Sequence, residues 1–364
     1  MSEKKEKINE FIAKLGDKDF KILFYVPDLK NQIAVSIYEI YKHVKTLNEI
    51  GYKAFLLTDN RLVGKNDKEE LYSHPDWFEK SLQELPTISM KDGEPISPCD
   101  FLIIPEYFPS IMEQCKALPC EKIVLFQSYS LMQSSLPIGT SWNNFDMKKV
   151  LTTSDKMVDY LSQYKNETYE IKKYDVGIPS YFQYDNEVKS LFIPFLSRNQ
   201  QDTINVIKDF YKKYPSMSWV SFEDMSGSNR EEFAQKLKTA PISLWIDRVA
   251  SFGTFPLESM TANCVCVGLV PDMIGDYFDS NNGIWTTNLL ELPDLLFKTI
   301  LSYIEDSLPV EIYEDSKKTA EQYNEANYVS SIGTVFGEYV SERIGFLTEV
   351  LKKENNIELS SDNL

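Results

Sequence analysis

One segment, residues 244–268, carries the residue types and spacing best suited to binding a charged ligand. Its sequence, LWIDRVASFGTFPLESMTANCVCVG, predicts a buried strand, an irregular loop, a short helix and a second buried strand. The loop contains Ser251, Gly253 and Thr254, and Pro256 suits the first helical turn, where its missing N–H leaves no bond unmade. Free backbone N–H groups at a helix start favour negative charge. We therefore expect a diphosphate at this turn.

This segment resembles the donor-binding stretch of the GT-B glycosyltransferases, in particular the large retaining family 4. That stretch has the form E-G-F-G-x-x-x-L-E-A-M-A-x-G, and the chain matches it with SFG at 251–253 and PLESM at 256–260. By resemblance, Glu258 accepts hydrogen bonds from the ribose hydroxyls of the donor nucleotide, which a carboxylate can do in pairs. The family also has an arginine on the donor diphosphate, and FLSR at 195–198 matches that position. The donor-binding residues implied are Arg198, Ser251, Phe252, Gly253, Thr254, Phe255, Leu257 and Glu258.

Three positions depart from the family pattern. Ala250 stands where the family has the first of its two glutamates, which contacts the donor sugar, Thr203 stands where it has a lysine, and Asn263 stands where it has the glycine after the helix. Asp247 precedes Ala250 in the same loop and is the candidate catalytic group that replaces this glutamate. The adjacent Arg248 would keep the Asp247 carboxylate ionised, because a nearby positive charge lowers an aspartate pKa. The alternative is that the two form a plain surface ion pair.

A second candidate catalytic carboxylate lies in the first half of the chain. Glu106 directly follows the apolar run FLIIP, so it is expected at the end of a buried strand, where its carboxylate could face the cleft. Retention of configuration, which the resemblance implies, needs no strong base from the protein. If the enzyme inverts instead, Glu106 or Asp28 would have to take the proton of the acceptor hydroxyl.

Apolar runs alternate with helical periodicity along the whole chain, which predicts an α/β fold. We expect two Rossmann-like, doubly wound parallel-sheet domains that face each other across a cleft, the GT-B arrangement. Residues 1–180 are assigned to the acceptor-side domain and 181–328 to the nucleotide-sugar donor domain, with a C-terminal helix at 329–355 packing back on the first. The predicted strands are 21–26, 54–58, 101–105, 122–126, 149–153, 171–176, 190–194, 219–222, 242–246 and 265–269. The main predicted helices are 4–15, 33–50, 203–214, 230–237, 256–262 and 289–304.

Composition and motifs exclude several other classes. The net charge of -17 argues against nucleic acid as a partner, because a binding groove needs clustered basic residues. Two histidines and five cysteines without a C-x-x-C pair argue against a zinc site. The triplet Asp17-Lys18-Asp19 has the form of a metal-binding D-x-D but precedes the first strand, where no nucleotide pocket exists. No P-loop and no G-x-G-x-x-G is present. The polar start and the lack of a long apolar stretch predict a cytoplasmic protein without a membrane span, and peripheral membrane contact stays open.

The sequence therefore predicts a transferase that moves a sugar from a nucleotide sugar, such as a UDP- or GDP-sugar, to a hydroxyl acceptor. The acceptor is expected to be a saccharide intermediate of glycan biosynthesis. No cofactor and no metal ion is expected, since a helix start and an arginine would stabilise the leaving diphosphate. One alternative is a non-catalytic, glycosyltransferase-like protein that binds nucleotide or sugar, or supports an active partner. Another is a sugar-nucleotide epimerase on the same fold.

Overall fold

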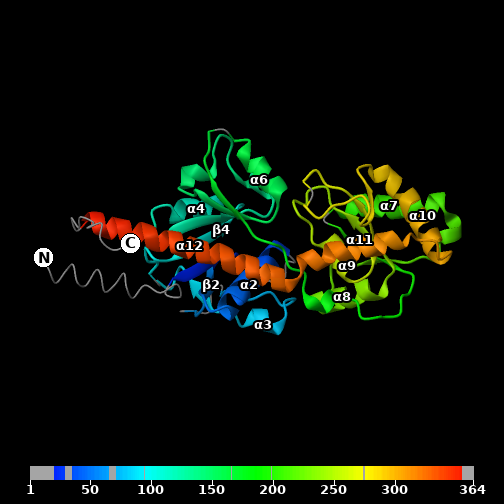
Figure 1. The fold of residues 1–364 in the computed structure, drawn as a ribbon, viewed down its shortest axis with the longest axis horizontal. Helices are drawn as coiled ribbons and strands as arrows, with labels where there is room; N and C mark the ends of the chain where they lie inside the picture. The colour runs from blue at the N-terminus through cyan, green and yellow to red at the C-terminus, as the bar shows by residue number, and fades with distance from the viewer. Residues whose placement is uncertain are drawn as a thin grey trace, which may run out of the picture.

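A computed structural model describes residues 20–28, 35–64, 71–93, 95–164, 166–197, 199–273 and 275–354. It contains two wholly parallel sheets covered by helices, which confirms the predicted fold class. Figure 1 shows the two units side by side, joined where the chain passes from the first sheet to the second. The helix predicted at 4–15 and the triplet Asp17-Lys18-Asp19 lie outside the described residues.

The first sheet has the strand order β3-β2-β1-β4-β5-β6-β7, all parallel. Alternation along β1 builds its two layers, since Ile22 and Phe24 pack against α2 while Leu23 and Tyr25 pack on the opposite face. The strands are β1 (Lys21–Tyr25), β2 (Lys53–Thr58), β3 (Thr87–Ser89), β4 (Phe101–Pro105), β5 (Glu121–Leu125), β6 (Lys149–Thr152) and β7 (Glu170–Lys173). The helices between them are α2 (Val35–Glu49), α3 (Lys80–Gln83), α4 (Pro109–Cys115), α5 (Tyr129–Ser135) and α6 (Asp155–Ser162).

The second sheet has the strand order β12-β11-β10-β8-β9, again all parallel. Trp245 packs on one face, while Leu244 and Ile246 pack on the other. Its strands are β8 (Ile193–Ser197), β9 (Phe222–Asp224), β10 (Ile242–Ile246), β11 (Val265–Leu269) and β12 (Ile284–Thr286). Its helices are α7 (Gln200–Lys213), α8 (Arg230–Thr239), α9 (Phe255–Thr261), α10 (Leu292–Ile304) and α11 (Val310–Ala320).

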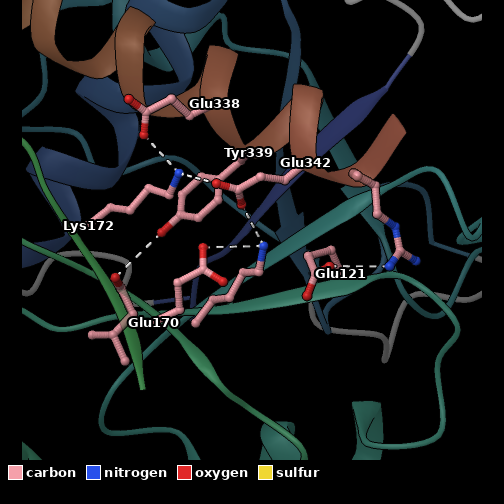
Figure 2. Close-up of polar contacts among 9 residues, drawn as sticks. Glu121, Glu170, Lys172, Glu338, Tyr339 and Glu342 are labelled. Atoms are coloured by element: carbon pink, nitrogen blue, oxygen red, sulfur yellow. Dashed lines mark hydrogen bonds and ion pairs between the residues drawn. The ribbon is translucent and has the colours of Figure 1, made fainter. Parts of the chain in front are cut away.

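The last helix, α12 (Glu325–Glu354), leaves the second unit and lies along the first (Figure 1). Its buried face, which includes Ile332 and Phe336, packs in the same core as α2 and β1. Figure 2 shows the polar side of this contact, in which Glu342 bridges Lys172 of β7 and Lys149 of β6 at 2.6 and 2.9 Å. Apolar packing and this ion network together fix α12 on the first sheet. Within the described ranges, no helix is both long and apolar enough to cross a bilayer.

Three predicted strands are displaced in the structure. β7 ends at Lys173 rather than at residue 176. β8 spans Ile193–Ser197 rather than 190–194, since its ladder with β9 starts at Ile193 and its ladder with β10 at Phe195. β9 begins at Phe222 rather than at residue 219, and Trp219 lies in a turn with 58% of its surface exposed. The errors at β8 and β9 arose from counting apolar residues that precede a strand as part of it.

Candidate active site

Loops at the carboxyl ends of the two sheets contact each other. The strand order reverses between β1 and β4 in the first sheet and between β8 and β10 in the second, and ligands of open α/β sheets bind at such switch points. The loop after β5 meets the loop after β10, since the Tyr129 N–H donates to Ser251 Oγ at 3.0 Å. The loop after β6 likewise meets the loop after β11, since the Asp155 N–H donates to Asp276 Oδ2 at 2.9 Å.

The loop after β10 depends on a glycine. Gly253 has φ +75°, a left-handed conformation that L side chains rarely adopt. A Cβ at this position would lie 2.6 Å from the Trp245 ring. The Tyr277 hydroxyl lies within hydrogen-bond distance of the carbonyl oxygens of Phe252 and Gly253, which anchors the turn from behind. The need for glycine at position 253 is therefore explained by the left-handed backbone and by the close approach of Trp245.

The predicted donor-binding segment is mostly buried. Phe252, Phe255 and Leu257 pack in the core of the second unit, so they could reach a ligand only through their backbone groups. Ser251 is also buried, whereas Gly253 and Thr254 are partly accessible. Helix α9 begins at Phe255, with Pro256 in its first turn as the sequence predicted.

Glu258 lies one turn into α9 and is only 1% exposed. Its Oε1 accepts a hydrogen bond from the Arg230 guanidinium at 2.7 Å. Arg230 is the first residue of α8, so neighbouring helices at the cleft edge supply the two charges. A carboxylate buried in this way needs a counter-ion, because desolvation otherwise favours its neutral form.

Asp247 has a clear role in the loop itself. Its Oδ1 accepts hydrogen bonds from the backbone N–H groups of Val249 and Ala250, both at 3.0 Å. The expected pairing of Arg248 with Asp247 is replaced by another one, since Arg248 Nε donates to Asp202 of α7 at 2.9 Å. Because short polar side chains often stabilise turns in this way, Asp247 shapes the strand-to-helix loop. Its role toward a donor sugar stays a prediction.

Arg198 lies outside the described residues. In the sequence it is the residue after Ser197, the last residue of β8. Its predicted contact with a diphosphate therefore stays a prediction. Within the described ranges, no three side chains of His, Cys, Asp or Glu gather as a metal-ligand set.

Glu106 lies at the switch point of the first sheet, immediately after β4, and is fully buried. Among the described residues, neither of its carboxyl oxygens has a hydrogen-bond partner of good geometry. Desolvation raises the pKa of Glu106 to about 8, and the nearby backbone N–H groups of Glu106 itself, Gln127 and Ser128 offset only part of this effect. At neutral pH, Glu106 is therefore mostly protonated.

Sequence reasoning missed Arg230 and its surroundings. The only local signal was that Arg230 opens a helix after the polar stretch 226–229, which is typical of many surface helices. Its partner Glu258 lies on a different helix, and Tyr38, whose ring faces the guanidinium, comes from the first unit. No spacing in the sequence could have connected these three residues.

The chain was compared with protein-family models, with curated proteins and with solved structures. No protein-family model matches the chain. It is 23% identical over 256 residues to an alpha-1,6-glucosyltransferase of Actinobacillus pleuropneumoniae serotype 7, an alignment that covers 65% of this chain and 72% of the relative. These findings and the shared fold described next support a glycosyltransferase enzyme, as the resemblance predicted.

Solved structures share the fold at low sequence identity. Sucrose-phosphate synthase from Thermosynechococcus elongatus has a TM-score of 0.61 at 11% identity, covering 89% of this chain and 100% of its own. The pneumococcal O-GlcNAc transferase GtfA, in complex with UDP and GlcNAc, has a TM-score of 0.61 at 10% identity, covering 89% and 99%. HepE from Anabaena, in complex with UDP, has a TM-score of 0.58 at 11% identity, covering 89% and 100%. The fold is therefore the GT-B fold, and membership of family 4 in particular stays a prediction.

Proposed function

We propose that this protein transfers a sugar, with glucose as the first candidate, from a nucleoside-diphosphate sugar to a hydroxyl group of a saccharide. The carrying observation is that loops at the carboxyl ends of two parallel sheets contact each other, since the Tyr129 N–H of the first unit donates to Ser251 Oγ in the loop 251–258 of the second. The name of the glucosyltransferase relative supports glucose, and the UDP complexes of two proteins with the same fold support uridine as the first base to test.

In this proposal the second unit holds the donor. Glu258 accepts hydrogen bonds from the ribose hydroxyls, and the backbone around Gly253 and Thr254, the partly accessible part of the turn, lies against the diphosphate. Arg198, at the end of β8, would neutralise charge on the leaving diphosphate without a metal ion. The acceptor would lie against the first unit, near the carboxyl ends of β1 and β4.

The protonation state of Glu106 bears on the stereochemistry. A general base must be ionised to take a proton, and a pKa of about 8 leaves Glu106 mostly protonated at neutral pH. Because Glu106 is also fully buried, it is poorly placed to deprotonate an acceptor. This supports a retaining reaction, in which the protein supplies no strong base. An alpha-linked product formed from an alpha-linked donor would show retention directly.

The test combines binding with turnover. UDP-glucose, UDP-GlcNAc, GDP-, ADP- and CMP-sugars are compared by thermal shift, since a ligand at a hundred times its Kd stabilises the protein by about 2.7 kcal/mol. Calorimetry with the best donor then compares wild type with Glu258→Ala and with the matched control Glu305→Ala, an exposed glutamate at the end of α10. Glu258→Ala should weaken binding at least about tenfold, whereas the control should not change it.

Two outcomes would contradict the proposal. If no nucleotide sugar stabilises the wild-type protein, the donor class is wrong. If a donor binds but neither transfer nor hydrolysis occurs with a range of saccharide acceptors, the chain is a binding protein rather than a transferase. Conversion of the bound sugar nucleotide in the absence of any acceptor would instead indicate an epimerase.

A further inference from the structure

Arg230 occupies an enclosed position between the two units of the molecule. Its guanidinium carbon lies 5.0 Å from the ring centres of both Tyr38 and Phe182, and 5.6 Å from that of Phe233. Only 11% of the Arg230 side chain is exposed. Tyr38 belongs to α2 of the first unit, Phe182 to the segment that joins the units, and Phe233 to α8 itself. A planar cation held between aromatic faces in this way has few orientations available.

Tyr38 is itself fixed by a triangle of hydrogen bonds. Its hydroxyl donates to Glu79 Oε1 at 3.0 Å, and Tyr181 donates to the same oxygen at 3.0 Å. The two tyrosine hydroxyls are 3.1 Å apart. Tyr181 lies next to Phe182 in the joining segment, so the triangle ties the first unit to that segment. The ring that faces Arg230 is therefore held in place by residues of the first unit and of the joining segment.

Besides the rings of Tyr38, Phe182 and Phe233, which form an aromatic cage around it, the Arg230 guanidinium contacts Glu258. Arg230 donates to Glu258 through a terminal guanidinium nitrogen at 2.7 Å, while its Nε has no hydrogen-bond partner among the residues that the structure describes. Burial works to lower the pKa of Arg230, but the Glu258 carboxylate, with Tyr181 and Tyr38, raises it above its ordinary value, so the charge is secure. The pair uses one strong hydrogen bond rather than two, which leaves carboxylate lone pairs available to a further donor.

We propose that Arg230 is a positioning residue of the donor site, which aims the Glu258 carboxylate at the ribose hydroxyls and is itself held by Tyr38 of the opposite unit. The role of Glu258 toward ribose rests on the proposed function; the contribution of Arg230 and the link to Tyr38 go beyond it. Because the aromatic cage draws on both units, the orientation of Glu258 depends on the packing of the first unit against the second. Donor affinity is then linked to the contact between the units.

The first test measures discrimination between ribose and deoxyribose. Calorimetry with UDP and 2′-deoxy-UDP gives an affinity ratio for each variant, with the matching GDP or ADP pair used if the wild type prefers another base. Wild type should favour the ribose form about tenfold or more, the value of one hydrogen bond to a charged group. Arg230→Ala should bring the ratio close to one, and Arg230→Lys should restore it in part, because a lysine keeps the charge but not the planar shape.

Controls separate positioning from general damage. Lys236→Met removes an ion pair from the same helix, the exposed Lys236–Glu223 contact at 2.7 Å, and should leave the ratio unchanged. Glu258→Gln should abolish the preference for ribose, and adding Arg230→Ala to it should change the ratio no further, since the two residues act as one unit. If Arg230→Ala keeps the wild-type ratio, or binds UDP more tightly, then Arg230 does not position Glu258 and the inference is wrong.

The second test needs no nucleotide and so stands apart from the proposed function. Hydrogen exchange of the joining segment, residues 177–184, is compared in the unliganded protein for Tyr38→Phe and Tyr38→Ala. The phenylalanine keeps the ring that faces Arg230, whereas alanine removes it. Exchange should therefore rise much more in Tyr38→Ala and in Arg230→Ala than in Tyr38→Phe. Equal exchange in Tyr38→Ala and wild type would refute the link between units, and failure of the wild type to bind any nucleoside diphosphate would refute the proposed function alone.

Discussion

The free energy of unfolding of the Glu106→Gln variant, relative to that of wild type, should increase as the pH rises. Glu106 is fully buried, its two carboxyl oxygens lack hydrogen-bond partners in the part of the chain that the structure describes, and desolvation raises its pKa from 4.5 to about 8. The folded state therefore favours the protonated carboxyl, while the unfolded chain ionises it at its ordinary pKa. The stability that the protonated group provides is fully present below pH 4.5 and is lost as the pH rises toward 8. Glutamine has nearly the same shape and cannot ionise, so it does not suffer this loss.

The size of the effect follows from the pKa difference. Each pKa unit corresponds to about 1.4 kcal/mol, so wild type should lose about 3 kcal/mol relative to Glu106→Gln by pH 7 and about 5 kcal/mol above pH 8. The absolute stability of the variant is less informative, because a buried amide can leave its own polar groups unpaired. The cost of these unpaired groups does not change with pH, so it cancels when the stability difference between the variant and wild type is compared at several pH values.

Urea unfolding at pH 5, 7 and 8.5, followed by tryptophan fluorescence, measures that difference directly. The matched control is Glu113→Gln on α4, an exposed glutamate a few residues further along the chain, whose difference from wild type should stay constant with pH. If the Glu106→Gln difference changes by less than about 1.4 kcal/mol between pH 5 and 8.5, then Glu106 ionises close to its ordinary pKa. That result would refute both its predicted protonation at neutral pH and the support it lends to a retaining reaction.

Three further predictions use the same assays. Gly253→Ala should lower the free energy of unfolding by about 2 kcal/mol or more, because the left-handed backbone disfavours a side chain and the new Cβ meets Trp245; an unchanged urea midpoint would contradict this. Arg343→Met should cost about 2–4 kcal/mol in urea unfolding, since its buried guanidinium donates to the Pro98 carbonyl from α12, whereas Glu338→Gln in an exposed pair should cost less than about 1 kcal/mol. Transfer activity should persist in excess EDTA, and complete loss restored by manganese or magnesium would show that the diphosphate needs a metal ion.

The buried strands were the most predictable part of the fold. The runs at 101–105, 242–246 and 265–269 match β4, β10 and β11 without error, because strands covered on both faces must be continuously apolar. The cap of α6 was also predictable, since Ser154 accepts a hydrogen bond from the Met157 N–H as a polar residue at a helix start does. These signals are local, so they survive in the sequence alone.

The short elements were not predictable. β3, β12 and α3 contain three or four residues each, which is too few to show a period. α11, at Val310–Ala320, is long enough to show a helical period, but it has only one buried residue and many polar ones. It therefore has no apolar face from which a helix could be predicted. Such elements exist because neighbouring strands and helices supply their contacts.

In the donor segment, too, some features could be predicted from the local sequence and others depended on tertiary contacts. The sequence alone located the loop and helix at 251–258, the need for a glycine at Gly253 and the first-turn position of Pro256. These features depend on backbone conformation, which a few consecutive residues determine. The structure showed in addition that most side chains of this segment belong to the core.

What the sequence by itself determined was therefore the order of elements, the fold class and the place of the carboxyl groups along the chain. Only the tertiary structure decided the state of those groups. Glu258 is held by Arg230 from another helix, whereas Glu106 is buried with no cation paired to it among the described residues. One carboxyl group is therefore paired with a cation and the other is mostly protonated at neutral pH. The physical reason is that charge in a protein depends on desolvation and on nearby charges, and both are supplied by segments far away in the chain.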